Sequence, residues 1–226
     1  MKAYELTLLS PLYYRSKIES GAAGATVTSP WIGDLAMMYG INNALGIKHI
    51  NFGYKSHKPN YKEILDLGFL LTVLEPLSNC RFTKVFDIAT NFMSEGYPQS
   101  EAISKSARAP MRNWMKRQGL EPGNRFSFIS LFKGEFEEFP KRFTVRLGNT
   151  RESVALIEEM PLHEIKQVTV NLYTLSIALG SQRFSEILDD IKTGKYKTHV
   201  EQASAQYILA KGIDVRGALE IFDPYN

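Results

Sequence analysis

The order of strand-like and helix-like segments in the first 90 residues most constrains the fold of this chain. Apolar and polar side chains alternate over Ala3–Leu9, which predicts a strand that ends before Pro11. A helical pattern follows after residue 29, and residues 68–74 and 81–90 have the character of two strands. Strand, helix, strand, strand is the first half of a ferredoxin-like domain. We therefore expect a sheet with one helix packed on it.

The predicted helix begins at Ser29-Pro30 and ends at Gly46. A capping hydroxyl followed by proline at the first helical position is a common helix start, and glycine is a common stop. One apolar stripe along this helix contains Leu35, Met38 and Leu45. We expect the stripe to pack on the sheet, so this helix is predicted to be structural.

The regular pattern breaks after Thr90. Residues 91–124 contain several prolines and glycines and have no strand pattern. An insertion of this length in a compact domain is usually functional or disordered. Within it, Pro110–Gln118 is predicted to form a short helix. We expect one domain over residues 1–226, with residues 91–124 as a basic insertion.

The second half of the chain continues with strand patterns and one clear helix. Three strands are predicted at Arg125–Phe132, Arg142–Leu147 and Val154–Glu159. Residues 164–179 favour a strand, with a helix as the open alternative. A helix follows that ends at Gly194, and residues 206–222 are predicted to form two strands. The chain is thus expected to be α+β, with more strand than helix.

Positive charge is concentrated in one window, residues 102–120, which has five cationic side chains and no carboxylate. The five are Lys105, Arg108, Arg112, Lys116 and Arg117. The whole chain has a net charge of +3, and without these five the other 22 basic residues face 24 acidic ones. Such a local field attracts a polyanion such as nucleic acid, although a solvated surface loop is the alternative.

Two other segments combine features that suit RNA. Aromatic and cationic side chains alternate after the first strand, which is typical of contacts with single-stranded RNA. These are Tyr13, Tyr14, Arg15 and Lys17. Arg146 and Arg151 flank a turn at Gly148, where backbone amides and a forked arginine contact could hold a phosphate. Core aromatics and an ordinary hairpin are the open alternatives.

Enzymatic and membrane-spanning classes have little support in the sequence. The four histidines, His49, His57, His163 and His199, are scattered, and no nucleophile, nucleotide or metal motif is present. Cys80 is the only cysteine, so neither a disulfide within the chain nor a cysteine-based zinc cluster is possible. We expect no catalytic residues, no metal and no cofactor, and a protein of the cytoplasm that does not enter the membrane.

Several of these segments together resemble a known family. They are the opening strand with Pro11–Arg15, the helix sequence SPWIGDLAMMYGINNALG, the basic insertion and Arg146-Leu147-Gly148. The chain is similar to the Cas-five-type (Csc-one) subunit of type I-D CRISPR Cascade surveillance complexes. The likeness covers most of the chain and is loose after about residue 160.

This resemblance implies a ferredoxin-like (RRM-type) RAMP fold in which residues 91–124 form a thumb-like insertion. It also implies a non-catalytic role in holding the 5′ handle of the guide RNA (crRNA). The implied neighbours are the backbone Cas-seven-type subunits, a large Cas-ten-type subunit and nearby target DNA. The basic window would then contact phosphates, Arg15 and Lys17 would face the handle, and Arg146 and Arg151 would support it. Tyr13 or Tyr14 would stack on bases.

Two alternative functions stay open from the sequence. One is a metal-independent endoribonuclease that processes CRISPR repeat RNA, since relatives of this fold have that activity. The other is a basic module that binds duplex DNA. Incubation with repeat RNA in EDTA separates the first alternative from a scaffold, and competition with duplex DNA separates the second.

Overall fold

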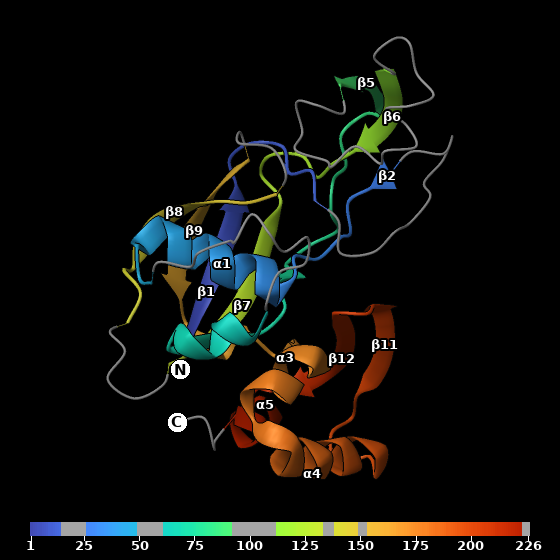
Figure 1. Ribbon diagram of the computed structural model, residues 1–226. Coiled ribbons are helices and arrows are strands. Elements are labelled where there is room, and N and C mark those ends of the chain that lie inside the picture. The colour runs from blue at the N-terminus through green and yellow to red at the C-terminus, as the bar shows by residue number, and fades with distance from the viewer. Residues whose placement is uncertain (15–25, 49–60, 92–111, 133–137, 149–152, 223–226) are drawn as a thin grey trace.

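The computed structural model describes residues 1–14, 26–48, 61–91, 112–132, 138–148 and 153–222. These residues form an α+β structure, as predicted, but their strands belong to three sheets where the sequence predicted one. A large sheet carries one helix, a second lobe combines a small sheet with three helices, and a third small sheet stands apart from both (Figure 1). The third sheet and the second lobe lie on one side of the large sheet, towards opposite ends of it.

The large sheet is antiparallel throughout, and its order is β3-β7-β1-β9-β8, with β4 also paired to β7. Its strands are β1 (Lys2–Leu8), β3 (Phe69–Leu71), β4 (Glu75–Pro76), β7 (Arg125–Phe132), β8 (Arg142–Arg146) and β9 (Val154–Met160). The order β3-β7-β1-β9 is that of a ferredoxin-like sheet. The strands predicted at the positions of β1, β7, β8 and β9 are therefore confirmed to within one residue at each end.

Helix α1 (Asp34–Leu45) starts later than predicted, but its stop and its packing are confirmed. Leu35 and Met38 are buried, and Gly46 caps the helix in the left-handed conformation at φ 63°. The predicted start at Ser29-Pro30 is wrong. Ile32 and Leu74 exchange backbone hydrogen bonds of 3.1 and 2.9 Å, so this segment is held as a bridge beside the sheet. Gly33 takes the capping position instead.

The second lobe differs most from the predicted pattern. Its sheet contains β10 (Gln167–Asn171), β11 (His199–Ser204) and β12 (Tyr207–Asp214), in the order β10-β12-β11. Its helices are α3 (Leu172–Ala178), α4 (Gly180–Lys192) and α5 (Val215–Phe222), and short 3-10 turns η2 (Tyr61–Asp66) and η3 (Leu162–Glu164) lie before it in the chain. The strand predicted over 164–179 is correct only for β10, because the Asn171 side chain caps α3 by accepting from Tyr173 N. The second strand predicted in 206–222 is a helix, α5.

The third sheet, here called the thumb sheet, consists of β2 (Thr26–Val27), β5 (Phe86–Asn91) and β6 (Arg112–Gln118). The helix predicted at Pro110–Gln118 is therefore wrong. β6 pairs antiparallel with β5, with Ile88 opposite Met115, and parallel with β2. Both partner strands are distant in sequence, so the local pattern did not reveal the pairing. Residues 92–111 lie outside the described residues.

The large sheet and the second lobe share one core. Their buried apolar residues form a single cluster. Trp31 is 6% exposed, and its ring centroid lies 5.3 Å from that of Tyr207 in an edge-to-face arrangement. The Val73 amide donates to Thr169 O at 2.9 Å, which joins the two sheets directly. Both parts are thus held as one packed unit.

Candidate nucleic-acid interface

Four segments that are distant in sequence meet where β1 ends and the chain leaves for the thumb sheet, and one of them is joined to the end of β6 by a backbone bridge between Phe82 and Leu120. Leu12 and Leu120 exchange backbone hydrogen bonds of 3.0 Å each, which join the segment after β1 to the end of β6. Gly148 follows β8 with φ +78°, and a Cβ atom there would lie 2.7 Å from the Tyr13 carbonyl oxygen. We call this region the neck and define it as residues 11–14, 81–84, 117–120 and 146–148.

Tyr13 lies at the centre of the neck. A Cβ atom on Gly119 would lie 2.5 Å from both Cδ1 and Cε1 of the Tyr13 ring, so the ring packs directly on the Gly119 backbone. The residue is half-buried, and the rest of it faces solvent. This placement keeps Tyr13 as a candidate for stacking on an unpaired base.

Tyr14 has a different role from the one predicted. Its side chain is buried in the core at 9% exposure, and its hydroxyl accepts a hydrogen bond of 2.6 Å from Gly33 N. Burial raises the pKa of the Tyr14 phenol above its ordinary value. Because neighbouring residues in an extended segment point to opposite sides, Tyr13 faces outward and Tyr14 inward. The prediction that Tyr14 stacks on an RNA base is therefore corrected: it is an anchoring residue.

The neck also contains two cations that the sequence reasoning missed. Thr83 N donates to Gly119 O at 2.9 Å, and Gly119 N donates to Thr83 Oγ1 at 3.0 Å. These bonds bring exposed Arg81 and Lys84 beside the end of β6. Arg81 also donates from Nη2 to Pro122 O at 3.2 Å. The alternation Arg81, Phe82, Thr83, Lys84 resembles the Tyr13–Lys17 pattern and was the available sequence clue.

The structure brings three of the predicted residues together at the neck: Tyr13, Arg117 and Arg146. Arg117 is half-buried in β6, between Thr26 and Phe86, and Arg146 is exposed at the end of β8. Arg112 and Lys116 lie in β6, and the structure describes their backbone but not their side chains. The other predicted contacts fall outside the described residues: Arg15, Lys17, Lys105, Arg108 and Arg151.

The face of the large sheet opposite α1 has a different character from the neck. Two cations of its solvent-exposed part are paired, Arg125 with Glu5 and Arg142 with Glu158 at 3.3 Å, and Arg146 at the end of β8 forms no ion pair with another described residue. The hydrogen bonds from Arg125 lower the pKa of the Glu5 carboxyl. RRM domains stack bases on aromatic side chains of their sheet. The described strand residues on this open part carry no aromatic ring; they are Glu5, Thr7, Arg125, Ser127, Arg142, Thr144, Arg146, Leu156 and Glu158.

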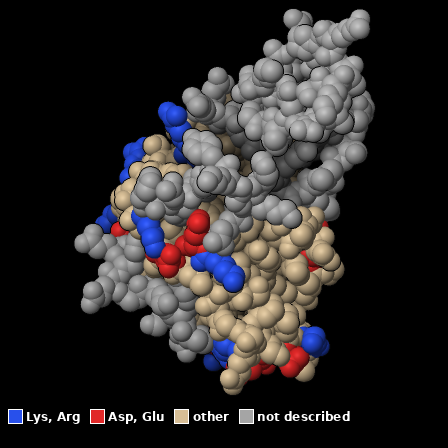
Figure 2. All heavy atoms as spheres, viewed as in Figure 1, with Lys and Arg blue, Asp and Glu red and all other residues tan. Residues whose placement is uncertain are grey.

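The charge distribution on the surface also separates the neck end from the second lobe. In the lower part of Figure 2, over the second lobe, basic and acidic side chains lie beside one another. At the upper edge of the described surface, basic side chains stand without an acidic neighbour in that view. The end of the molecule that carries the neck is therefore the more suitable one for a polyanion.

The part of the chain that the structure describes has neither a metal-binding cluster nor a helix that could span a membrane. No group of three or more His, Cys, Asp or Glu residues there is arranged to hold a metal ion. No helix among those residues is long and apolar enough to cross a membrane. His163 and His199 are exposed on η3 and β11, and the other two histidines lie outside the described ranges.

Comparisons with known proteins identify the family. The sequence model of the type I-D CRISPR-associated protein Cas5/Csc1 family matches residues 1–208. A search of curated proteins found no match. Among solved structures, a chain of the type III-B Cmr-beta complex bound to cognate target RNA and AMPPnP is similar at 11% identity and a TM-score of 0.41. That match covers 100% of this chain and 90% of the other. Because the family match extends over residues 1–208 of 226, the chain belongs to the type I-D CRISPR-associated Cas5/Csc1 family.

Proposed function

We propose that this protein is a non-catalytic guide-RNA-binding subunit of a type I-D CRISPR interference complex, and that its neck holds the crRNA 5′ handle. The observation that carries the proposal is the convergence at the neck of Tyr13, Lys84 and Arg146 from three separate segments. Membership in the Cas5/Csc1 family supports a place in a CRISPR effector.

Three side chains of the neck, those of Tyr13, Lys84 and Arg146, have distinct tasks in this proposal. Lys84 and Arg146 neutralise phosphates of the RNA backbone. Their charges are available for this role, because both residues are exposed and form no ion pair with another described residue. Tyr13 supplies a flat surface on which one unpaired base can stack. The ring packs against the Gly119 backbone, which holds it in position. Together these contacts recognise a single strand by its phosphates and by stacking.

The neighbours of this subunit follow from its family. The proposed partners are the backbone Cas-seven-type subunits and the large Cas-ten-type subunit, with target DNA nearby. Residues 91–124, the predicted thumb-like insertion, are the proposed contact to guide RNA beyond the neck. Two of its cationic positions, Arg112 and Lys116, lie in β6, whose C-terminal end is part of the neck.

A double variant of the neck tests the proposal. We expect Lys84→Ala/Arg146→Ala to weaken binding of single-stranded handle RNA and to reduce the slope of log affinity against log salt by about 1.4, or about 0.7 for each lost phosphate contact. The matched control is Lys62→Ala/Lys192→Ala, which removes the same charge from exposed positions away from the neck. The measurement is equilibrium binding over a range of salt concentrations, with EDTA present.

Two outcomes would contradict the proposal. An unchanged salt slope in the neck variant would show that the neck does not contact phosphates. Cleavage of repeat RNA in the same EDTA mixtures would show a metal-independent ribonuclease and overturn the non-catalytic part. We expect the RNA to stay whole.

A further inference from the structure

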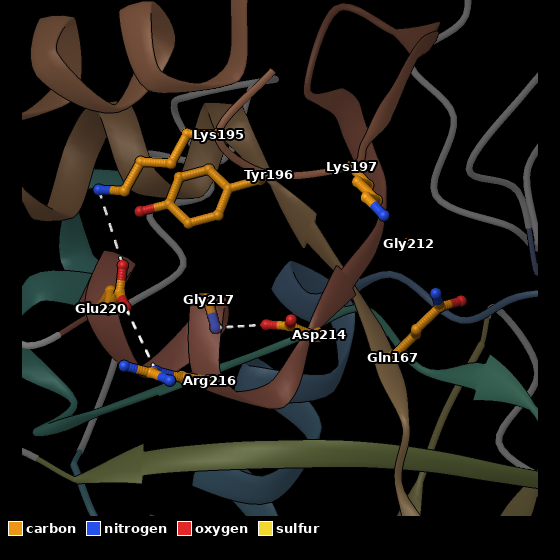
Figure 3. A pocket seen from close by; sticks show the side chains of 9 residues that line it. All are labelled: Gln167, Lys195, Tyr196, Lys197, Gly212, Asp214, Arg216, Gly217 and Glu220. Atoms are coloured by element: carbon orange, nitrogen blue, oxygen red, sulfur yellow. Dashed lines mark hydrogen bonds and ion pairs between the residues drawn. The ribbon is translucent and has the colours of Figure 1, made fainter. Parts of the chain in front are cut away.

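A pocket in the second lobe lies outside the neck and has no role in the proposed function. Its volume is about 380 Å³. Lys195 to Lys197 form one wall, the end of β12 and the first turn of α5 form another, and Gln167 of β10 lies on a third side (Figure 3). A pocket of this size lies in the range of ligand sites.

Two glycines keep the walls of this pocket close together and free of side chains. A Cβ atom on Gly217 would lie 2.9 Å from Cδ1 of Tyr196 and 3.0 Å from Asp214 Oδ1. Gly212 has φ +84°, and a Cβ atom there would lie 3.3 Å from the Lys197 carbonyl oxygen. Any other residue at Gly217 would press on the Tyr196 ring, so the pocket depends on glycine at this position.

The carboxylates of the pocket already have partners. Glu220 lies between Lys195 Nζ at 3.6 Å and Arg216 Nε at 3.7 Å. Asp214 Oδ1 accepts a 2.6 Å hydrogen bond from Gly217 N and so caps the first turn of α5. Lys195 also contacts Asp190 Oδ2 at 2.8 Å, and this hydrogen bond raises the pKa of Lys195. Glu220 therefore has two cationic neighbours, and Asp214 has a backbone donor but no ion pair with another described residue.

Cationic and amide donors remain available to a ligand. The side chains of Lys197 and Gln167 are exposed and form no hydrogen bond or ion pair with the described residues. Arg216 is 89% exposed; it is ion-paired with Glu220 at 3.7 Å, which is beyond hydrogen-bond distance, so its N–H groups can also face a ligand. In Figure 3, the side chains of Lys197 and Gln167 lie on one side of the pocket and that of Arg216 lies on the other. Donors on two sides of a recess suit a group with several oxygen atoms, such as phosphate.

We propose that this pocket binds a phosphate group and that it is a second contact for the backbone of a bound single-stranded RNA. This proposal rests on the proposed RNA-binding function. Lys197 supplies a point charge, Arg216 a guanidinium and Gln167 an amide donor. Lys195 and Arg216 offset the charge of Glu220, and the hydrogen bond from Gly217 N holds the Asp214 carboxylate at the start of α5.

Two measurements on the full chain test this site. First, we expect Lys197→Ala/Arg216→Ala to lower the salt slope of RNA binding by about 0.7, the value for one phosphate on a single strand. Lys62→Ala/Lys192→Ala is again the control of equal charge. Second, titration with inorganic phosphate should shift the NMR amide signals of Gly212 and Gly217, which both line the pocket, in the unmodified protein and not in the double variant. Both substituted residues are exposed, so the variant should fold.

The outcomes separate this inference from the function on which it rests. If the pocket variant keeps the full slope while the neck variant loses about 1.4, RNA binding stands and the pocket proposal falls. If neither variant changes the slope, both proposals fall. If phosphate shifts the amides but the slope stays unchanged, the site takes a free anion only, and the assignment to RNA is overturned.

Discussion

Asp34 shows how a single buried carboxyl connects the two main parts of the molecule. It is the first residue of α1, is 0% exposed, and accepts hydrogen bonds from Thr174 and, at 3.0 Å, from Asn171 Nδ2. Both donors belong to the second lobe. Burial raises the pKa of Asp34 to about 6, although the hydrogen bonds act in the opposite direction. The ionised form is therefore less favourable in the folded than in the unfolded chain.

We expect Asp34 to make the folded state less stable as pH rises. Its ordinary pKa is 3.8, so between about pH 4 and 6 the unfolded chain loses this proton while the folded chain keeps it. The free energy of unfolding should fall over this window, by on the order of 3 kcal/mol, and stay level above it. Asp34→Asn should remove this part of the pH dependence, because the amide cannot ionise. The measurement is urea unfolding from pH 4 to 8.

The control for this prediction is Asp66→Asn, which removes an exposed carboxylate outside the network. That variant should retain the decline between pH 4 and 6. A decline of equal size in Asp34→Asn and in the unmodified protein would show that Asp34 does not ionise differently on folding.

At the residue scale, the sequence indicated which kinds of side chain matter but not which way each points. Tyr13 and Tyr14 were equivalent in the pattern, and only the fold turns one outward and one into the core. Arg81 and Lys84 lie in a segment, residues 81–90, that was predicted as a strand, and they were not identified as candidate RNA contacts. Their place at the neck depends on hydrogen bonds between Thr83 and Gly119, which are 36 residues apart.

At the element scale, the strands of the large sheet were predictable because alternation reflects one buried face. Elements whose secondary structure depends on pairing or packing with distant segments could not be predicted from the local pattern. β6 contains no β-branched residue and is a strand through pairing with β5 and β2. α5 was read as a strand because its apolar residues are close together, yet its buried residues, Ala218, Ile221 and Phe222, follow helical spacing.

Helix α1 provides the prediction at this scale. Leu35 is 2% exposed in the core, so Leu35→Ala should lower the free energy of unfolding by about 2–5 kcal/mol through lost burial and a cavity. Denaturant unfolding followed by circular dichroism measures the effect. Asn43→Ala is the matched control, because Asn43 is exposed on the same helix and its truncation should change stability by less than about 0.5 kcal/mol. Equal effects of the two substitutions would show that Leu35 does not pack as described.

At the scale of the whole molecule, the sequence predicted a single domain with an insertion. The sequence did not predict the two lobes or the contact between them, because contacts such as that of Trp31 with Tyr207 join residues far apart in the chain. The shared cluster of buried residues indicates that the large sheet and the second lobe unfold together. Among the described residues, the thumb sheet is connected to the large sheet at the neck and to α1 through residues 28–33, where Thr28 N donates to Gln118 O at 3.0 Å.

This arrangement predicts that the body unfolds in one cooperative transition. Trp31 and Trp114 are the only tryptophans, so Trp114→Phe leaves Trp31 as the sole fluorescent reporter at the contact between the lobes. In this variant, thermal unfolding followed by tryptophan fluorescence should coincide with unfolding followed by far-UV circular dichroism. Coincident curves are the test of a two-state transition. Tyr207→Ala removes the ring that meets Trp31 and should lower both midpoints together, because the contact contributes to one common stability. An earlier fluorescence transition in the Trp114→Phe protein would instead show that the lobes separate before either one unfolds.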